Sequence, residues 1–201
     1  MSLLLSASTL INNTINLKIF IINLTISFVI IIVSILAKKL AARAIDAKSE
    51  IKIWQFKRYW ITTRSEFKKP VPMGVILPIL LSFISLGFIK FLAFFQTELE
   101  AMPSRVAKKY GLRRYSDIME WDGSLVVFYS TLALLILAVI CSFITSKSFS
   151  FFELAKYSLY YSIYNIIPFS SLDGVKLFMG SKPLYVFTLI LIAITALIIF
   201  L

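Results

Sequence analysis

The residues with the clearest capacity for chemistry lie in a short stretch near the C-terminal end, NIIPFSSLDG at positions 165–174. This stretch contains a helix-breaking proline, two serine hydroxyls, a carboxylate at Asp173 and a closing glycine, and apolar sequence surrounds it. Burying an ionisable side chain at membrane depth costs free energy, so such a residue suggests a functional site. Because carboxylates are common metal ligands, the first chemistry that Asp173 suggests is metal binding.

The same stretch also has a purely structural interpretation. Pro, Ser, Asp and Gly are the commonest turn residues, so the segment is also compatible with a helix end followed by an ordinary turn. In that case Asp173 caps the next short helix. Ser170 and Ser171 have no histidine partner, and the spacing to Lys176 does not require a Ser–Lys dyad.

Composition limits the metal chemistry. A catalytic zinc site needs about three protein ligands from His, Cys, Asp or Glu, plus an open position. The sequence has no histidine and a single cysteine, Cys141, which lies in an apolar segment and suits a packing role. The other candidate carboxylates alternate with basic residues, as in a solvated loop: Glu98, Glu100, Asp117, Glu120 and Asp122. We therefore expect no cofactor.

The elements that must position Asp173 are membrane helices. The chain is 59% hydrophobic with a mean hydropathy of +0.89, far above the values for a soluble domain. A transmembrane helix needs about 20 mostly apolar residues. We predict an all-α membrane protein, a polytopic helix bundle of four to five segments in one domain over 1–201. The predicted segments are about 19–37, 71–96, 125–146, 151–168 and 183–201.

The charge of +11 is concentrated beside the first segment. Ten of the 21 basic residues lie at positions 38–69, which is typical of the positive-inside rule and of contact with anionic headgroups. We expect this loop on the cytoplasmic side, and no nucleic-acid partner, since no RNA-binding motif accompanies the charge. The first helix is expected to continue past the membrane, and residues 50–62 to form a short strand or hairpin on the membrane surface.

Residues 71–96 carry Pro72, Pro78, two glycines and Lys90, so this segment is either a kinked span or a re-entrant hairpin. A lysine deep in an apolar run either snorkels or pairs with a buried carboxylate. Lys90 and Asp173 are therefore a candidate buried ion pair.

The C-terminal stretch resembles the second signature of the site-2 protease family, the intramembrane zinc metallopeptidases. Five residues match that signature: Asn165, Pro168, Leu172, Asp173 and Gly174. The resemblance implies that the aspartate is the third zinc ligand, on a broken helix. The family's first signature, HExxH, is followed by an alanine-rich basic continuation similar to KKLAARAIDAKSEIKIW at positions 38–54.

This overlay places Ser34 and Lys38 at the two histidine positions and Ile35 at the general base. The family's Gly-Pro-x-x-Asn element is also missing, and YSTLA at 129–133 lies in its place. A lysine repels a divalent cation, and isoleucine cannot take a proton from a metal-bound water.

The sequence therefore predicts a non-catalytic relative of the family, a pseudoprotease that binds or scaffolds another membrane protein within the lipid bilayer. Relatives bind extended segments by strand addition, as the resemblance implies, and that contact needs no zinc. Two alternatives stay open: a zinc peptidase completed by ligands from a partner chain, and a small structural or channel-like subunit of a membrane complex.

Overall fold

The computed structural model describes residues 17–58, 66–84, 92, 94–102, 118–144 and 149–201. In this part of the chain there are six helices: α2 (Leu17–Ala44), α3 (Met73–Ile84), α5 (Glu120–Ile144), α6 (Phe149–Ile166), α7 (Asp173–Gly180) and α8 (Lys182–Phe200). Four strands accompany them: β1 (Ala47–Ile53), β2 (Phe56–Arg58), β3 (Glu66–Val71) and β4 (Phe95–Ala101). The described chain is thus mainly helical, as predicted.

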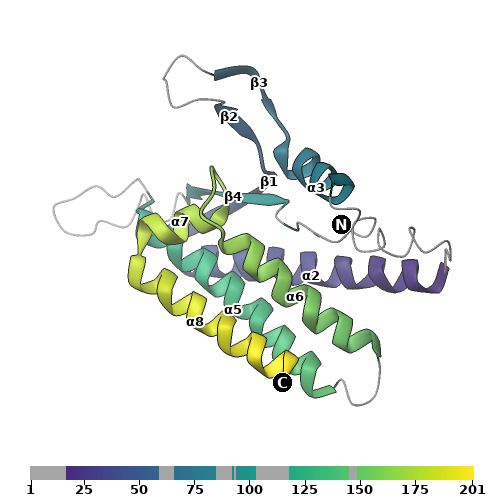
Figure 1. Cartoon of the computed structure of the whole chain (residues 1–201). Coiled ribbons are helices and arrows are strands. Elements are labelled where there is room, and N and C mark those ends of the chain that lie inside the picture. Colours follow the sequence, from purple (N-terminus) through teal and green to yellow (C-terminus); the bar gives the residue numbers. More distant parts are fainter. Residues whose placement is uncertain (1–16, 59–65, 85–91, 93, 103–117, 145–148) are drawn as a thin grey trace.

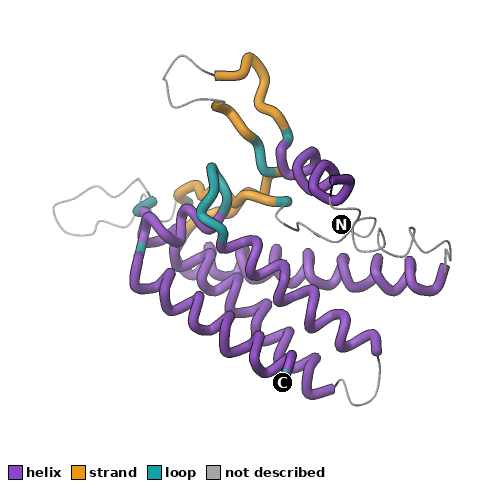
Figure 2. The backbone as a smooth tube through the Cα atoms, viewed as in Figure 1, coloured by secondary structure: helices purple, strands orange, loops and turns teal. Residues whose placement is uncertain are grey.

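Helix α5 is the centre of the bundle. It packs against α2, α6, α7 and α8. Of the residues in its most apolar stretch, 50% are buried, whereas the corresponding share in α8 is 22%. Figure 1 shows α5, α6 and α8 side by side, with α2 crossing behind them. The strands gather at one end of these helices, where the β2–β3 hairpin projects away from the bundle (Figure 2). Asp173 therefore lies where the bundle meets the strands.

Three of the described helices are long and apolar enough to cross a membrane, over Ile21–Ala44, Glu120–Ile144 and Lys182–Phe200. This is typical of an integral membrane protein. The predicted total of four to five spans is not confirmed. The segment predicted at 151–168 is a helix, α6. It is not one of the three candidate spans, because its charged and hydroxyl-bearing residues lower its hydropathy.

Helices α5 and α6 pack against each other, and both bury small residues. Ser130 and Thr131 on α5 are fully buried, as are Ala155 and Ser158 on α6. Small side chains at a helix interface let two helices pack closely in a membrane protein. The Thr131 and Ser158 hydroxyls donate to carbonyls one turn earlier in their own helices, so these buried groups are satisfied locally.

The first helix continues well past the predicted span and ends at Ala44, which confirms the expected extension. Asp46 then takes a left-handed conformation (φ 54°) and turns the chain into β1. Strand β1 pairs antiparallel with β4, with Ala47 opposite Ala101 and Ile53 opposite Phe95. Strands β2 and β3 form a separate antiparallel pair.

Residues 71–96 do not form one helix. Helix α3 covers 12 residues, and β4 begins at Phe95. The Gly74 N–H donates to the Trp54 carbonyl, and the Trp54 N–H donates to the Phe94 carbonyl. Both ends of this segment therefore lie beside Trp54, so the chain leaves the strands and returns to them.

Candidate functional site

Two breaks in the helices bring the site residues together. Helix α6 ends at Ile166, two residues before Pro168, because a proline cannot continue the helical hydrogen bonding. Ser170 then adopts a left-handed conformation (φ 54°), and α7 begins at Asp173. This abrupt turn points the Asp173 carboxylate away from solvent.

The carboxylate of Asp173 receives three hydrogen bonds. The Lys38 Nζ donates to Oδ2 at 2.6 Å, the Thr97 hydroxyl donates to Oδ2 at 2.9 Å, and the Thr97 backbone N–H donates to Oδ1 at 2.9 Å. All three residues are almost completely buried, with exposed fractions of 0% for Asp173 and 1% for Lys38 and Thr97. The donors come from α2 and β4, so this centre ties three elements together.

Charge decides the protonation state of this carboxylate. Burial alone would raise the pKa of Asp173, but the positive charges of Lys38 and Lys176 and the hydrogen bonds hold it below its ordinary value. The pKa of the Lys176 amine is lowered, because burial and the charge of Lys38 outweigh the attraction of Asp173. Asp173 is therefore a carboxylate in the folded protein at neutral pH.

The three residues overlaid on HExxH all lie on α2. Ser34 and Lys38 are one turn apart on α2, and both are buried, so they face the interior of the bundle together. Ile35 is partly buried beside them. The ammonium of Lys38 thus meets Asp173 from the position that the overlay assigns to the second imidazole.

Three other matched residues are also buried: Asn165, Leu172 and Gly174. Leu172 is fully buried and packs against Trp54. Asn165 is buried near the end of α6, and its amide nitrogen has no hydrogen-bond partner among the described residues. Gly174 starts α7 so close to α6 that an added Cβ would lie 2.2 Å from the Ile166 carbonyl oxygen. Its role is therefore to allow the close packing of α7 against the end of α6.

Two sequence-based interpretations of Asp173 can now be compared with its contacts. Asp173 does not cap α7, because Leu172 is the N-cap residue and has no side-chain capping bond. The proposed partner Lys90 lies outside the described residues, so that pairing stays a prediction. The observed ion pair of Asp173 is with Lys38.

The residues present do not fit a zinc ion. No group of three or more His, Cys, Asp or Glu side chains in the described part of the chain could hold a metal. The charged residue that bonds to Asp173 is a lysine, and its charge has the same sign as that of a metal ion. One carboxylate bonded to an ammonium cannot complete the three-ligand set of a catalytic site.

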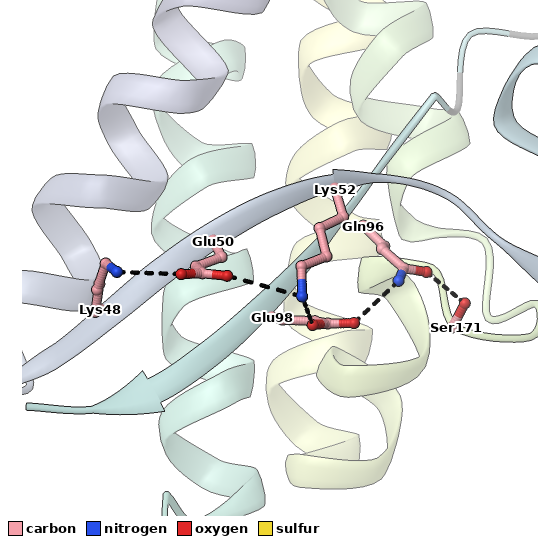
Figure 3. A network of polar contacts seen from close by, with 6 residues as sticks. All are labelled: Lys48, Glu50, Lys52, Gln96, Glu98 and Ser171. Atoms are coloured by element: carbon pink, nitrogen blue, oxygen red, sulfur yellow. Dashed lines mark hydrogen bonds and ion pairs between the residues drawn. The ribbon is translucent and has the colours of Figure 1, made fainter. Parts of the chain in front are cut away.

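A second polar network covers the outer face of β1 and β4 (Figure 3). Glu50 and Glu98 lie directly opposite each other, and the Lys52 ammonium pairs with both. The network then continues through Gln96, which bonds to Glu98, to the Ser171 hydroxyl at 2.6 Å. These bonds attach the sheet to the turn that precedes Asp173.

Sequence reasoning missed β4, and with it Thr97 and Gln96. The predicted segment 71–96 ends inside this strand, so Glu98 and Glu100 fall in a predicted loop. A signal was present, because FQTELEA alternates polar residues at 96, 98 and 100 with Phe, Thr, Leu and Ala. This two-residue period is typical of a half-buried strand.

Comparisons of the chain with protein-family models, with curated proteins and with solved structures found no match.

Proposed function

We propose that this chain is a non-catalytic, site-2-protease-like membrane protein that binds or scaffolds another membrane protein. The observation that carries the proposal is the buried Lys38–Asp173 ion pair. In the resembled family, an aspartate in this motif completes a metal site. In this chain the Lys38 ammonium pairs with the Asp173 carboxylate, in the place that a metal ion would take in that family.

The arrangement supports a site that lacks the catalytic residues of the resembled family but has a buried Asp173 and neighbouring strands. A positive charge at Lys38 satisfies Asp173 and compensates its burial, which an uncharged residue at position 38 could not do. Neither Ser34 nor Ile35 can activate a water molecule in the manner of a glutamate base. The strands beside the site remain, and a strand edge binds an extended segment through backbone hydrogen bonds alone.

Metal content and metal restoration test this proposal. The purified wild-type protein is expected to contain no stoichiometric zinc and to show no chelator-sensitive proteolysis. The triple variant Ser34→His, Ile35→Glu, Lys38→His supplies two imidazoles one turn apart opposite Asp173, and we expect it to bind about one zinc ion. Adding Asp173→Ala to the triple variant should abolish that binding.

A matched control moves the same three residue types by one position. The variant Ile35→His, Leu36→Glu, Lys39→His retains Lys38 and turns two of its new side chains outward, since Leu36 and Lys39 are exposed. It should not bind zinc. Failure of the first triple variant to bind zinc while it stays folded would count against the family relationship. Stoichiometric zinc in the wild type would end the non-catalytic proposal in favour of a peptidase completed by a partner.

A further inference from the structure

One edge of strand β4 adjoins a cavity and is not paired with another described strand. Hydrogen bonds of an antiparallel strand point alternately to its two sides. The Trp54 N–H bonds to Phe94 and the Met102 N–H bonds to Asp46, so the even-numbered residues of this strand face β1. The Thr97 N–H points to the other side, where it meets Asp173. By the same alternation, the N–H and C=O groups of Leu99 point away from β1.

Asp173 therefore closes this edge at Thr97, and from Leu99 onward no described residue pairs with it. Leu99 lies opposite Ser49 in the register, but no described residue forms a backbone hydrogen bond with the Leu99 N–H or C=O. A cavity of about 620 Å³ adjoins this edge. Its remaining walls come from the first turn of α5, including Gly123, and from Val175 and Met179 of α7. It is large enough for a few residues of an extended chain.

The cavity is acidic although the protein is basic. Three carboxylates line it, from Glu98, Glu100 and Glu120, against one ammonium, from Lys176. Glu98 is paired with Lys52, whereas Glu100 and Glu120 form no ion pair with any described residue. Both are exposed at the mouth of the cavity. In a chain with a net charge of +11, this is a local site for a cationic group.

The geometry points to a binding site for a basic, extended segment of another membrane protein, which adds a strand at Leu99 and places a Lys or Arg side chain between Glu100 and Glu120. Segments next to transmembrane helices are often rich in Lys and Arg, so a juxtamembrane segment fits the charge and the location. Apolar side chains of the same segment would contact Leu99, Ile118 and Met179. This inference rests on the proposed binding function and specifies the chemistry of its partner.

Peptide binding to the full-length protein in nanodiscs tests the inference. The probe is a fluorescent Val/Thr-rich peptide of about nine residues with two central lysines, compared with the same peptide carrying two glutamates. We expect the lysine peptide to bind more tightly. The double variant Glu100→Gln, Glu120→Gln should weaken its binding about tenfold and leave the glutamate peptide unweakened.

Three controls separate charge, strand pairing and access to the cavity. Glu50→Gln removes an exposed carboxylate of β1 that does not line the cavity, and it should leave the affinity unchanged. N-methylation of alternate peptide residues removes backbone donors and should weaken binding with the lysines intact. Gly123→Leu places a side chain between Leu99 and Lys176 and should block both peptides.

The outcomes are distinguishable. Equal affinity of the lysine peptide for the wild type and the Glu100/Glu120 variant would overturn the inference that these carboxylates recognise a basic segment. The proposed binding function would still stand in that case, because the peptide would still bind. A photo-crosslinker at the exposed residue Met179 should capture the lysine peptide. Capture of the chain's own residues 103–117 instead would overturn the intermolecular assignment. Absence of any peptide binding to a folded protein would overturn the inference as a whole.

Discussion

At the residue scale, the centre of this protein is one buried carboxylate that three donors hold in place. Two of these donors belong to Thr97 and the third to Lys38. Burying a charge is unfavourable unless it is paired and hydrogen-bonded. Asp173 meets both conditions, and its position is determined by contacts with residues far away in the sequence.

The first prediction concerns the Lys38–Asp173 pair. Replacing Lys38 with Met leaves Asp173 buried without its main partner, and we expect the free energy of unfolding to fall by about 3–5 kcal/mol. The double variant Lys38→Met, Asp173→Leu removes both charges and should recover much of this loss. Unfolding in detergent, arranged as a double-mutant cycle, measures the coupling. Equal losses in the single and double variants would contradict the ion-pair role.

The second prediction concerns pH. The pKa of folded Asp173 lies below its ordinary value of 3.8, so around that pH the unfolded chain binds more protons than the folded chain. The stabilisation from this group is therefore present at neutral pH and is lost as the pH falls below about 4, through the folded pKa. When unfolding is measured at pH 7, 4 and 3, the free energy of unfolding should fall less steeply with decreasing pH for Asp173→Asn than for the wild type. The comparison uses the slopes, because the substitution also changes the stability at pH 7.

At the element scale, the junction between α6 and α7 depends on how closely two backbones approach. The added Cβ of an alanine at position 174 would lie 2.2 Å from the Ile166 oxygen and 2.6 Å from the Ile167 oxygen. Backbone atoms cannot move aside as a flexible side chain can. The glycine of the Leu-Asp-Gly motif is therefore required by packing, and it places Asp173 at the start of α7.

A comparison of two glycines tests this third prediction. Gly174→Ala should lower the free energy of unfolding by about 1–3 kcal/mol, the usual effect of overpacking. Gly123→Ala should instead raise it by about 0.4–1 kcal/mol, because its Cβ would meet only Leu99 and Lys176 side chains at 3.9 Å within a helix. Both variants can be compared in one denaturation series. Similar effects at the two positions would rule out a special role for the α6–α7 contact.

The elements that could be predicted are those with a strong local signal. The uncharged runs within α2, α5 and α8 are long and apolar enough to be predicted as membrane helices from the sequence alone. The α3 region was ambiguous, because Pro72 and Pro78 are compatible with a kink as well as with a hairpin. Its return to the strands depends on backbone bonds between Trp54 and residues 74 and 94, and no local pattern contains such bonds.

At the scale of the whole molecule, polarity is divided between the two ends of the bundle. The strands, α7 and the ion pairs of Figure 3 lie at one end, and the apolar faces of α5 and α8 extend away from them. Large apolar side chains on these helices are exposed, such as Phe143 and Leu197. Lipid is the solvent that suits such surfaces.

The fourth prediction follows from this division and from the basic residues at positions 38–69. In a Cys141→Ala background, a cysteine replacing Lys48 on β1 should react with a membrane-impermeant maleimide only from the cytoplasmic side. The Lys48 side chain is 63% exposed, so access does not require unfolding. A cysteine replacing Phe143 should stay unlabelled from both sides, since we expect this exposed position of the candidate span Glu120–Ile144 to contact lipid. Labelling of position 48 from the outside would reverse the topology.

The sequence by itself determined the class of protein and the limits of its chemistry. Long apolar runs require a membrane, and a chain without histidine cannot supply the imidazoles of a zinc peptidase. Only the tertiary structure decided which cation meets Asp173. Lys38 lies 135 residues away, and it reaches the carboxylate because α2 packs against α5 while the α6–α7 turn directs Asp173 inward. Local periodicity reports which face of a helix is buried, but the partner of a buried charge is set by how separate elements pack.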